Sequence, residues 1–507
     1  MNAKKHIFYR GSLSFCNYSC SYCPFSKGKG SERQLQQDRE ELTRFVDQLK
    51  VSEFRGAVQI VPYGEALIHD YYWEALACMS RIPGVEAVGA QTNLSFPVER
   101  MLSIYREAGG KVEKLRLWGT FHPEMVSIEQ FLMTCAALGQ EGVSFCVGSV
   151  GVPGNISLLQ ELRSKLDSSV YLWINKMDGL GRNYTEKEVE ELCEIDEYFE
   201  LELQHHKADA KKCNTAIFVD SRGECHPCNM CRNSVGNIYD TSLKRLFREC
   251  GKRKACKKKE CECYLAYGNR RDLEELVFFQ PYPAFRIPVY KKAIFFDVDG
   301  TLVAEEEKEL SEKKAAWIRK LAMHSDIYLA TSLPYEDAMR KMKPVASLVS
   351  GGVFAGGGRV RIQMKESEMV FWDRVASIHE EVMPFVERLR STYVFRIHTY
   401  KRGQKLYKIV LNFWVDELPK QMLKDIGKLR KVCHVMIEDN KVELTAKGAS
   451  KLAGIQRICE KLTMSLDDIA VFGNSEADLE MIREVPFSVA AAGSCKAVKE
   501  VAKIVLE

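Results

Sequence analysis

Cys16, Cys20 and Cys23 form a C-x3-C-x2-C run that directly follows the first stretch able to form a strand, residues 6–10. Three thiolates on one short loop can ligate three irons of a [4Fe–4S] cluster and leave the fourth iron open. Structural zinc sites usually have four ligands and use C-x2-C pairs, so a three-residue first gap fits zinc poorly. The spacing therefore predicts an iron–sulfur cluster with one open iron on this loop.

This spacing, with the aromatic Tyr22 before the last cysteine, resembles the radical S-adenosylmethionine (AdoMet) superfamily. The resemblance implies that the amino and carboxylate groups of AdoMet bind the open iron. It also implies that an electron from the cluster cleaves the sulfonium bond and releases a 5′-deoxyadenosyl radical, which abstracts hydrogen from the substrate. An electron donor such as flavodoxin or ferredoxin would reduce the cluster. Cofactor and cluster then carry the difficult chemistry, and the protein positions and shields them.

Other residues in the first 180 positions match this family in part. Gly64-Glu65 resembles the Gly-Gly-Glu motif that contacts the AdoMet amino group, although its first glycine is Tyr63 here. For Asn93 and Asn175, turn formation is the alternative role. The resemblance implies a cofactor-binding set of Tyr22, Gly64, Glu65, Asn93, Gly148, Val150 and Asn175.

His122 lies in Phe121-His122-Pro123-Glu124, at the end of another expected strand. Its ordinary pKa makes it a candidate proton donor, and it is also a candidate substrate contact. A histidine before a proline also occurs in plain loops. The functional role and the loop role both stay open for His122.

A second group of eight cysteines lies between Cys213 and Cys263. Disulfide bonds are not expected, because the cytosol keeps thiols reduced. The stretches 223–231 and 235–238 resemble the SPASM or twitch extensions of radical AdoMet enzymes, which bind one or two auxiliary iron–sulfur clusters. The later cysteines do not keep the usual spacing, so we expect one auxiliary cluster, with a zinc ribbon as the competing interpretation. Its four ligands would come from Cys213, Cys225, Cys228, Cys231, Cys256, Cys261 and Cys263.

A further motif, D-x-D-G-T at residues 297–301, follows an apolar run of the kind that a strand buried on both faces requires. It resembles the first motif of haloacid dehalogenase-like (HAD) phosphatases. The resemblance implies that Asp297 attacks phosphorus and becomes an aspartyl phosphate, while Asp299 protonates the leaving oxygen and later activates water. Thr331 would supply a hydroxyl, and Lys451 would stabilise the charge on the transferring phosphoryl group.

The same resemblance implies a bound Mg²⁺, which offsets the repulsion between the nucleophilic carboxylate and the phosphate. Its implied ligands are Asp297, Asp299, Asn474 and Asp478. The family usually has an acid at the position of Asn474. An asparagine still offers a carbonyl oxygen, but one negative charge facing the metal is lost. We therefore expect a weakened affinity for Mg²⁺.

The elements that must position these residues alternate regularly. Over residues 1–205, apolar strand-like runs are separated by helical stretches, of which residues 31–50 carry apolar side chains at helical spacing. This alternation predicts a parallel α/β sheet, closed or part-closed into a barrel. Radical AdoMet proteins use a partial (β/α)6 barrel, and function in such barrels collects at the C-terminal ends of the strands. The predicted fold class is α/β throughout.

The predicted organisation has four parts. These are a barrel at 1–205, a cysteine-rich segment at 206–275, a linker rich in proline and aromatic residues at 276–290, and a Rossmann-like HAD domain at 291–507. The centre of the last part has a strand–helix pattern of its own and resembles the α/β (C2-type) cap of the Cof-type branch. The expected core is therefore 291–350 with 446–507, and the expected cap is 351–445.

Charge and hydropathy exclude few partners. The net charge of +4, from 73 basic and 69 acidic residues, does not by itself argue for nucleic acid or a membrane surface. The basic run at 252–259 has no interleaved aromatic residues on which bases could stack, which argues against nucleic acid. Since no apolar stretch is long enough for a signal peptide or a membrane span, a cytoplasmic location is expected.

Two catalytic modules on one chain predict successive steps on one pathway. The first hypothesis is a radical AdoMet enzyme that modifies a small, phosphorylated metabolite, with the HAD domain removing phosphate before or after the radical step. The second is a peptide or protein maturase, which predicts a peptide partner. The third is a regulatory fusion whose HAD domain only binds a phosphorylated ligand, which Asn474 makes conceivable.

Overall fold

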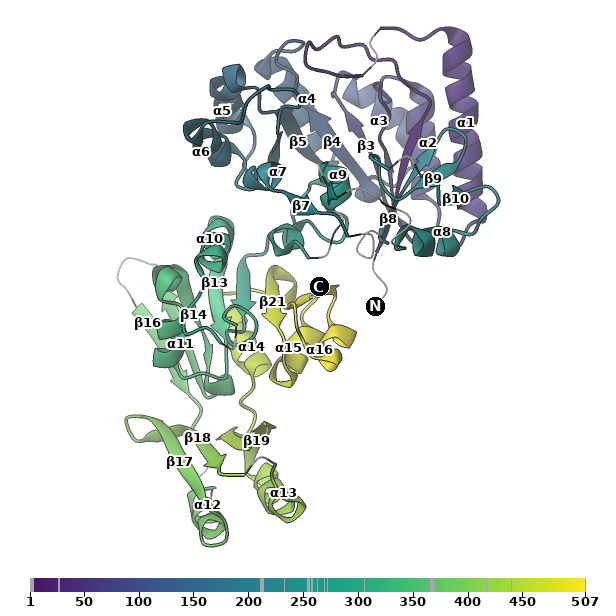
Figure 1. Cartoon of the computed structure of the whole chain (residues 1–507). Helices are drawn as coiled ribbons and strands as arrows, with labels where there is room; N and C mark the ends of the chain where they lie inside the picture. Colours follow the sequence, from purple (N-terminus) through teal and green to yellow (C-terminus); the bar gives the residue numbers. More distant parts are fainter. Residues whose placement is uncertain are drawn as a thin grey trace. The chain divides into compact units, whose positions relative to one another are not determined.

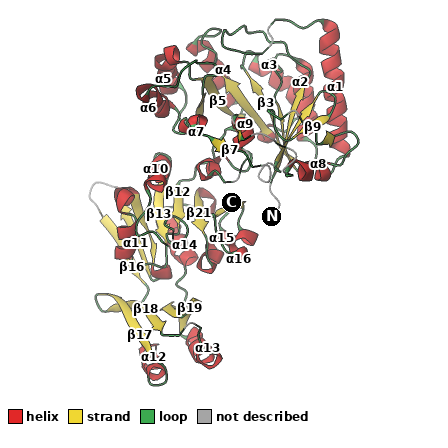
Figure 2. Ribbon diagram, in the orientation of Figure 1, coloured by secondary structure: helices red, strands yellow, loops and turns green. Residues whose placement is uncertain are grey.

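Parallel strands and the helices between them make up most of both halves of the chain (Figures 1 and 2). The computed structural model describes residues 4–25, 28–209, 214–231, 233–252, 256, 259–261, 263–268, 270, 272–304, 306–364, 370–378, 380, 382–415, 417–438 and 440–506. The chain forms two units, residues 2–289 and residues 290–507. The predicted α/β fold class is confirmed in both units.

Six parallel strands of the first unit lie side by side in chain order, from β1 to β6, and a helix follows each of the first five. Their bounds are β1 Lys5–Gly11, α1 Glu32–Val51, β2 Gly56–Ile60, α2 Asp70–Ser80, β3 Val85–Thr92, α3 Val98–Glu107, η1 Val112–Lys114, β4 Leu115–Thr120, α4 Ile128–Gln140, β5 Ser144–Val150, η2 Pro153–Asn155, α5 Ile156–Lys165 and β6 Leu172–Asn175. This order puts the carboxyl ends of all six strands at one edge of the sheet, where the predicted cofactor residues follow them.

Local sequence explains why these elements form. Helix α1 begins at a capping box, in which the Ser31 side chain accepts from the backbone N–H of Gln34 and the Gln34 side chain reaches back. Its buried face carries residues at helical spacing: Leu42, Phe45, Val46 and Leu49. Strand β2 is buried along its whole length, as expected for a parallel strand with helices on the sheet.

The cysteine-rich segment extends the same sheet on the other side of β1. Strand β8 pairs in parallel with β1, and β9 and β10 follow it in antiparallel pairs, so the order is β10-β9-β8-β1-β2-β3-β4-β5-β6. Among the described residues, β10 and β6 end the ladder, which is open. The bounds are α6 Glu186–Ile195, α7 Glu200–Leu203, β7 His206–Lys207, β8 Ala216–Asp220, β9 Glu224–His226, β10 Gly236–Asn237, α8 Leu243–Cys250, β11 Glu260–Cys261 and α9 Tyr264–Tyr267. Residues 206–275 are thus part of the first unit.

The segment predicted as a linker, 276–290, packs into the first unit instead. It contains the short helices η4 (Glu274–Phe279) and η5 (Pro283–Phe285) and buries Leu276 through Phe279. Arg286 is completely buried, and its guanidinium carbon lies 3.8, 4.2 and 3.9 Å from the ring centroids of Trp118, Trp173 and Tyr264. Such cation–π contacts hold the segment against the inner face of the sheet. The proline-rich composition predicted a linker, but the large apolar side chains of this segment are buried and pack it into the first unit.

The second unit is built on an eight-stranded sheet in the order β16-β15-β14-β13-β12-β21-β22-β23. Strands β14, β13, β12, β21, β22 and β23 pair in parallel, and β15 and β16 are antiparallel additions. The bounds are β12 Ala293–Phe296, α10 Glu312–Leu321, β13 Asp326–Ala330, α11 Tyr335–Lys341, η6 Lys343–Leu348, β14 Val349–Phe354, η7 Ala355–Gly357, β15 Arg359–Met364, β16 Val370–Val375, α14 Lys451–Lys461, η9 Leu466–Asp468, β21 Ile469–Gly473, η10 Glu476–Asp478, α15 Leu479–Glu484, β22 Phe487–Ala490, α16 Lys496–Val501 and β23 Ile504–Val505.

A four-stranded antiparallel sheet, β17-β18-β20-β19, forms the cap of this unit. Helices α12 and α13 lie on the face of the cap sheet that is turned away from the core (Figure 1). The cap starts later than predicted, because β15 and β16 pair with the core sheet and not with the cap, so residues 351–375 belong to the core. The bounds are α12 Val382–Arg390, β17 Phe395–Arg402, β18 Lys405–Phe413, α13 Lys420–Gly427, η8 Lys428–Lys431, β19 Cys433–Glu438 and β20 Lys441–Ala446.

In the described ranges, none of the helices combines enough length with enough apolar character to cross a membrane.

Candidate functional site

A cavity of about 350 Å³ opens where strands β2 to β6 end in the first unit. The three cysteines Cys16, Cys20 and Cys23 line it. All but one of the predicted AdoMet-binding residues line it as well: Tyr22, Gly64, Glu65, Asn93, Val150 and Asn175. The exception is Gly148 in β5, where a Cβ atom would lie 2.8 Å from Trp118 Nε1, so this glycine allows close packing behind the cavity.

Glu65 is held at the cavity by backbone and side-chain donors. Its carboxylate accepts hydrogen bonds from Thr92 Oγ1 at 2.7 Å, from the backbone N–H of Asn93 at 2.6 Å and from the backbone N–H of Leu67 at 3.0 Å. Burial raises the pKa of Glu65 to about 7, although these three donors oppose the shift. An acceptor that is buried, oriented and near neutral pKa suits an ammonium group of a ligand.

The cysteine loop is joined to the loops that follow β2 and β3. The backbone N–H of Glu65 donates to the carbonyl of Phe15 at 2.9 Å, and a Cβ on Gly64 would lie only 2.0 Å from that oxygen. Asn93 Nδ2 donates to Asn17 Oδ1 at 3.0 Å and lies 3.9 Å from Cys16 Sγ. Gly64 is therefore required by the close approach of the two backbones.

Glu124 and His122, in the loop after β4, contact Ser21 and Tyr22 of the cysteine loop; these contacts are called the brace. The Glu124 carboxylate accepts from the backbone N–H of Ser21 at 2.6 Å and from its hydroxyl at 2.5 Å. Tyr22 Oη and His122 Nδ1 form a hydrogen bond of 2.9 Å. Burial lowers the pKa of His122 to about 4, so the ring is neutral at physiological pH. His122 lines the cavity, but its visible contact is with the cysteine loop, which supports a positioning role.

The three thiols fit a thiolate-ligated cluster. Burial raises the pKa of Cys16, and burial together with the charge of Cys23 raises the pKa of Cys20 to about 11. Such thiols lose their protons when a metal supplies the compensating charge. Three thiols and the buried carboxylate of Glu65 thus line one cavity.

The cysteine-rich segment separates its thiols into distinct groups. Cys231 Sγ lies 3.2 Å from Cys256 Sγ, and the neighbouring Cys228 raises the pKa of Cys231. Charges on Cys228 and Cys256 also raise the pKa of Cys261, in addition to its burial. These four thiols are therefore near one another.

The remaining predicted ligands of this segment have other contacts. Cys225 is buried in the core near Cys250, and Cys263 accepts a hydrogen bond from Asn229 Nδ2 at 3.3 Å. Cys213 lies outside the described residues. Over the described part of the chain, no group of three or more His, Cys, Asp or Glu side chains is already arranged around a metal position.

The HAD-like residues of the second unit lie at the carboxyl ends of three adjacent parallel strands. Asp297 follows β12, Thr331 follows β13 and Asn474 follows β21. Lys451 is the first residue of α14, whose start is capped by the Ser450 side chain. Parallel pairing of β12 with both β13 and β21 brings these chain segments to one point.

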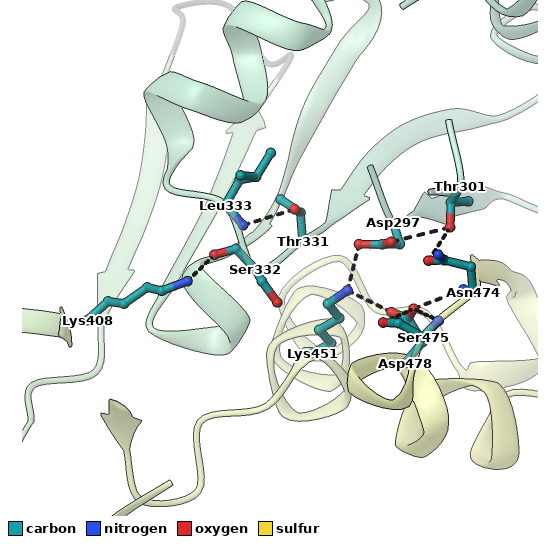
Figure 3. A network of polar contacts seen from close by, with 10 residues as sticks. All are labelled: Asp297, Thr301, Thr331, Ser332, Leu333, Lys408, Lys451, Asn474, Ser475 and Asp478. Atoms are coloured by element: carbon teal, nitrogen blue, oxygen red, sulfur yellow. Dashed lines mark hydrogen bonds and ion pairs between the residues drawn. The ribbon is translucent and has the colours of Figure 1, made fainter. Parts of the chain in front are cut away.

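Lys451 lies between two carboxylates (Figure 3). Its ammonium nitrogen is 2.6 Å from Asp297 Oδ1 and 2.7 Å from Asp478 Oδ1, and all three side chains are buried. Burial and the negative charge of Asp478 raise the pKa of Asp297 to about 7, while Lys451 opposes that shift. The two carboxylates raise the pKa of Lys451, although burial alone would lower it. Lys451 thus stays charged at the position where anionic oxygens gather.

Asp478 and Asn474 complete this group. Asp478 Oδ2 accepts from the backbone N–H groups of Asn474 and Ser475, both at 3.0 Å. The Asn474 amide is best satisfied with its nitrogen turned inward, where it donates to Asp297 Oδ2 at 3.0 Å and to Thr301 Oγ1 at 3.0 Å. To bind a metal ion, this amide would have to present its oxygen instead. The residues fit an Mg²⁺ site with one ligand weaker than a carboxylate.

Asp299 and Thr331 are placed differently. Asp299 Oδ1 forms an ion pair of 2.6 Å with Lys341 Nζ at the end of α11, a contact that the sequence did not reveal. The Thr331 hydroxyl accepts from the backbone N–H of Leu333 at 3.0 Å and keeps its own hydrogen available. Asp297, Asp299, Thr331, Lys451 and Asn474 all line one cavity of about 740 Å³. The predicted acid/base is therefore in the site but engaged by a lysine.

The cap contributes the opposite wall of this cavity. Lys408 of β18 is buried, forms a 2.7 Å ion pair with Glu443 of β20 and donates to the backbone carbonyl of Ser332 (Figure 3). His398, Tyr400 and Asn412 also face the cavity from the cap. No motif marked these residues, because the register of the cap strands cannot be predicted from local sequence patterns.

Comparison with known proteins identifies the second unit. Residues 385–507 match the model of the haloacid dehalogenase-like hydrolase family. The chain is 23% identical over 230 residues to 5-amino-6-(5-phospho-D-ribitylamino)uracil phosphatase of Bacillus subtilis, covering 43% of this chain and 90% of that protein. It is 25% identical over 223 residues to phosphoglycolate phosphatase of Archaeoglobus fulgidus, covering 42% of this chain and 89% of that protein.

Among solved structures, a haloacid dehalogenase-like hydrolase from Bacteroides thetaiotaomicron is similar, with a TM-score of 0.36, 17% identity, and coverage of 42% of this chain and 93% of that chain. The family match confirms the predicted HAD-like hydrolase domain in the C-terminal unit.

Proposed function

We propose that the chain is a bifunctional enzyme. Its C-terminal unit hydrolyses small phosphate esters, and its N-terminal unit carries out radical AdoMet chemistry on a small, phosphorylated metabolite. The single observation that supports the hydrolase most is Lys451, held by Asp297 and Asp478 at the ends of β12 and β21. Similarity to two phosphatases supports the same activity.

The residues of the second unit account for hydrolysis in two steps. A carboxylate oxygen of Asp297 attacks phosphorus, the bond to the ester oxygen breaks, and Asp299 gives that oxygen a proton. Water then attacks the aspartyl phosphate, and Asp299 takes up its proton. Lys451 and the Thr331 hydroxyl stabilise the charge on the phosphoryl oxygens. Before it can act, Asp299 must leave its ion pair with Lys341.

Mg²⁺, held by Asp297, Asp478 and Asn474 with Asp299 beside them, would offset repulsion between the nucleophile and the phosphate. The test is phosphate release from a panel of small phosphate esters by the whole chain. Asp297→Asn should abolish release, and Asp467→Asn, which changes an exposed carboxylate, should leave it unchanged. Release that survives Asp297→Asn would contradict the assignment of the nucleophile, and no release by the wild type would favour a HAD domain that only binds phosphorylated ligands.

For the N-terminal unit, we infer a [4Fe–4S] cluster on Cys16, Cys20 and Cys23 with AdoMet in the adjoining cavity. The cluster and AdoMet together supply the one-electron chemistry that starts hydrogen abstraction. The carboxylate of Glu65 would bind the AdoMet amino group, and Asn93 would orient the cofactor from the end of β3. The observation that carries this proposal is that Cys16, Cys20, Cys23, Glu65 and Asn93 line one cavity.

We also propose Cys228, Cys231, Cys256 and Cys261 as the ligands of one auxiliary metal centre. Their proximity supports this set over the buried Cys225. Metal analysis of protein purified without oxygen, in wild type and in Cys231→Ser, distinguishes an iron–sulfur centre from zinc. Unchanged metal content in Cys231→Ser would exclude the set.

The radical assignment is tested by 5′-deoxyadenosine release from reconstituted protein without oxygen, with a chemical reductant or flavodoxin as electron donor. Host extract, split by size, supplies candidate substrates. Stimulation by the small-molecule fraction that is lost when Cys16, Cys20 and Cys23 are all changed to Ala supports the metabolite hypothesis. Stimulation by polypeptides alone would favour a peptide maturase. Absence of release with iron bound would contradict radical chemistry.

A further inference from the structure

Arg10 carries a charge that the protein does not neutralise. It is the penultimate residue of β1, six positions before Cys16. Its Nε–H is buried without a hydrogen-bond partner. Within the described ranges, no carboxylate forms an ion pair with it and no acceptor receives a hydrogen bond from it. A guanidinium cannot lose its charge in a protein, so this edge of the site keeps an unmatched cation.

Aromatic faces surround this guanidinium and leave its N–H edges for an acceptor. The guanidinium carbon lies 4.4 Å from the ring centroid of Tyr63 and 5.9 Å from that of Phe218. Phe8 stacks on Phe218 at 4.4 Å beneath it. The Tyr63 ring restricts where the guanidinium can lie, and a guanidinium held in place favours a bidentate oxyanion such as carboxylate or phosphate.

The position of Arg10 joins it to the reaction cavity. Tyr63, on which Arg10 stacks, lines that cavity together with the three cysteines. Tyr63 is also the residue that replaces the first glycine of the Gly-Gly-Glu motif. A further polar atom on this face is His226 Nδ1, which is also buried without a partner. His226 pairs across from Phe218, so it shares a face with Phe218, Phe8 and Arg10.

A second arginine shows what a purely structural stack looks like. Arg44 lies 3.7 Å from the ring centroid of Tyr239, but Arg44 is exposed and its N–H groups can be hydrated. Arg10 makes the same type of contact with a donor shut off from water. The difference between the two arginines is therefore that water can hydrate the N–H groups of Arg44 but does not reach Arg10 Nε.

We propose that Arg10 anchors an oxyanion of the substrate at the edge of the cavity, with His226 as a second donor. The ligand chemistry is a phosphate or a carboxylate group on a small molecule. This rests on the proposed function only in taking the cavity beside Tyr63 as the place of the radical step. If the anion is a phosphate ester, the radical step precedes its removal by the HAD domain.

The test measures arginine labelling by phenylglyoxal in the whole chain, resolved by peptide mass spectrometry. Inorganic phosphate or acetate at ~10 mM, the range in which one charge-assisted contact binds a free anion, should slow labelling of Arg10 at least about twofold. Labelling of Arg44 should not change. Protection by phosphate alone identifies a phosphate group, protection by acetate alone a carboxylate, and protection by both an oxyanion site. No protection of Arg10 by either anion would overturn the proposal.

A functional measurement separates this proposal from the assignment of the radical reaction. Arg10→Gln should raise the amount of small-molecule fraction needed for half-maximal 5′-deoxyadenosine release by about tenfold, as expected for one lost charge-assisted hydrogen bond. Arg44→Gln is the matched control and should not change it. An unchanged requirement in Arg10→Gln overturns the anchor while the radical assignment stands. If the wild type releases no 5′-deoxyadenosine, the assignment fails, and the labelling result still decides whether Arg10 binds an anion.

Discussion

The two units organise their reactive groups in opposite ways. In the C-terminal unit, the ammonium of Lys451 forms ion pairs with two carboxylates, so the protein's own charges hold the site together. In the N-terminal unit, Cys16, Cys20 and Cys23 line one cavity, and among the described residues no carboxylate forms an ion pair with Arg10. The first arrangement is complete before a ligand binds. In the N-terminal unit, loop contacts hold the cysteines in place, and the charge of Arg10 has no ion-pair partner among the described residues.

The largest effect is expected when Lys451 is removed from the C-terminal site. Lys451→Met leaves Asp297 and Asp478 as two buried carboxylates without a cation, and we expect a loss of phosphate-ester hydrolysis of at least about 100-fold. Because Lys451 holds the pKa of Asp297 down, the variant should also need higher pH for the same fraction of ionised nucleophile. Rates across pH 5 to 9 measure both effects. A rate equal to wild type would show that Asp297 does not depend on Lys451.

A smaller effect is expected where the N-terminal unit relies on loop contacts. Glu124→Gln removes the charge that receives two hydrogen bonds from Ser21 and should speed iron loss to a chelator by about tenfold, as for other residues that orient metal ligands. Glu129→Gln changes an exposed carboxylate in the next helix and serves as control. Equal rates of iron loss in both variants would mean that the brace does not position the cluster loop.

Asn474→Asp tests Mg²⁺ binding in the C-terminal unit. A carboxylate in place of the amide restores a negative ligand, so the Mg²⁺ concentration for half-maximal hydrolysis should fall several-fold, by roughly 1 kcal/mol of binding free energy. The same variant loses the amide donor to Asp297 Oδ2, which should lower its stability without Mg²⁺. Magnesium titration and thermal melting with and without the metal measure the two effects. A rise in the Mg²⁺ requirement would contradict a ligand role for this position.

The smallest effect concerns a buried histidine in the N-terminal unit. Burial lowers the pKa of His6 to about 3, and neither ring nitrogen has a hydrogen-bond partner among the residues that the structure describes. Below pH 6.5 the unfolded chain binds a proton that the native chain does not, so stability falls by up to about 1.4 kcal/mol per pH unit. In His6→Phe the melting temperature should fall less between pH 7.5 and pH 5.5 than in wild type. Equal pH dependence would show that His6 is protonated in the native state.

Local patterns predicted the groups that are close in sequence or follow strands directly. The cysteine loop, Glu65 and the D-x-D-G-T motif belong to this class, because each depends on spacing within a few residues of a strand end. Contacts between distant segments were missed. Glu124 reaches Ser21 across 103 positions, and Lys341 reaches Asp299 across 42. Nothing in the sequence around either residue specifies its partner.

The boundary between the two units lies within one residue of the predicted position, but the start of the cap was predicted less well for a related reason. Apolar alternation predicts that β15 and β16 are strands, but it does not say which sheet they join, and their pairing with β14 places them in the core. The four grouped thiols of the cysteine-rich segment posed the same difficulty. Sequence spacing made Cys225 and Cys228 equally good candidate ligands. Only the fold shows that Cys225 is completely buried.

The burial of Arg286 has a consequence for synthesis of the chain. The inner face of the first sheet is completed by a side chain that is translated after every strand of that sheet, so nascent N-terminal units stay unfinished until residue 286 has left the ribosome. The HAD domain begins only a few residues later, at β12. Any natural or designed separation of the two units must therefore cut between about residue 289 and β12. A cut at residue 275 would leave Arg286 on the C-terminal fragment, although its aromatic contacts are in the N-terminal unit.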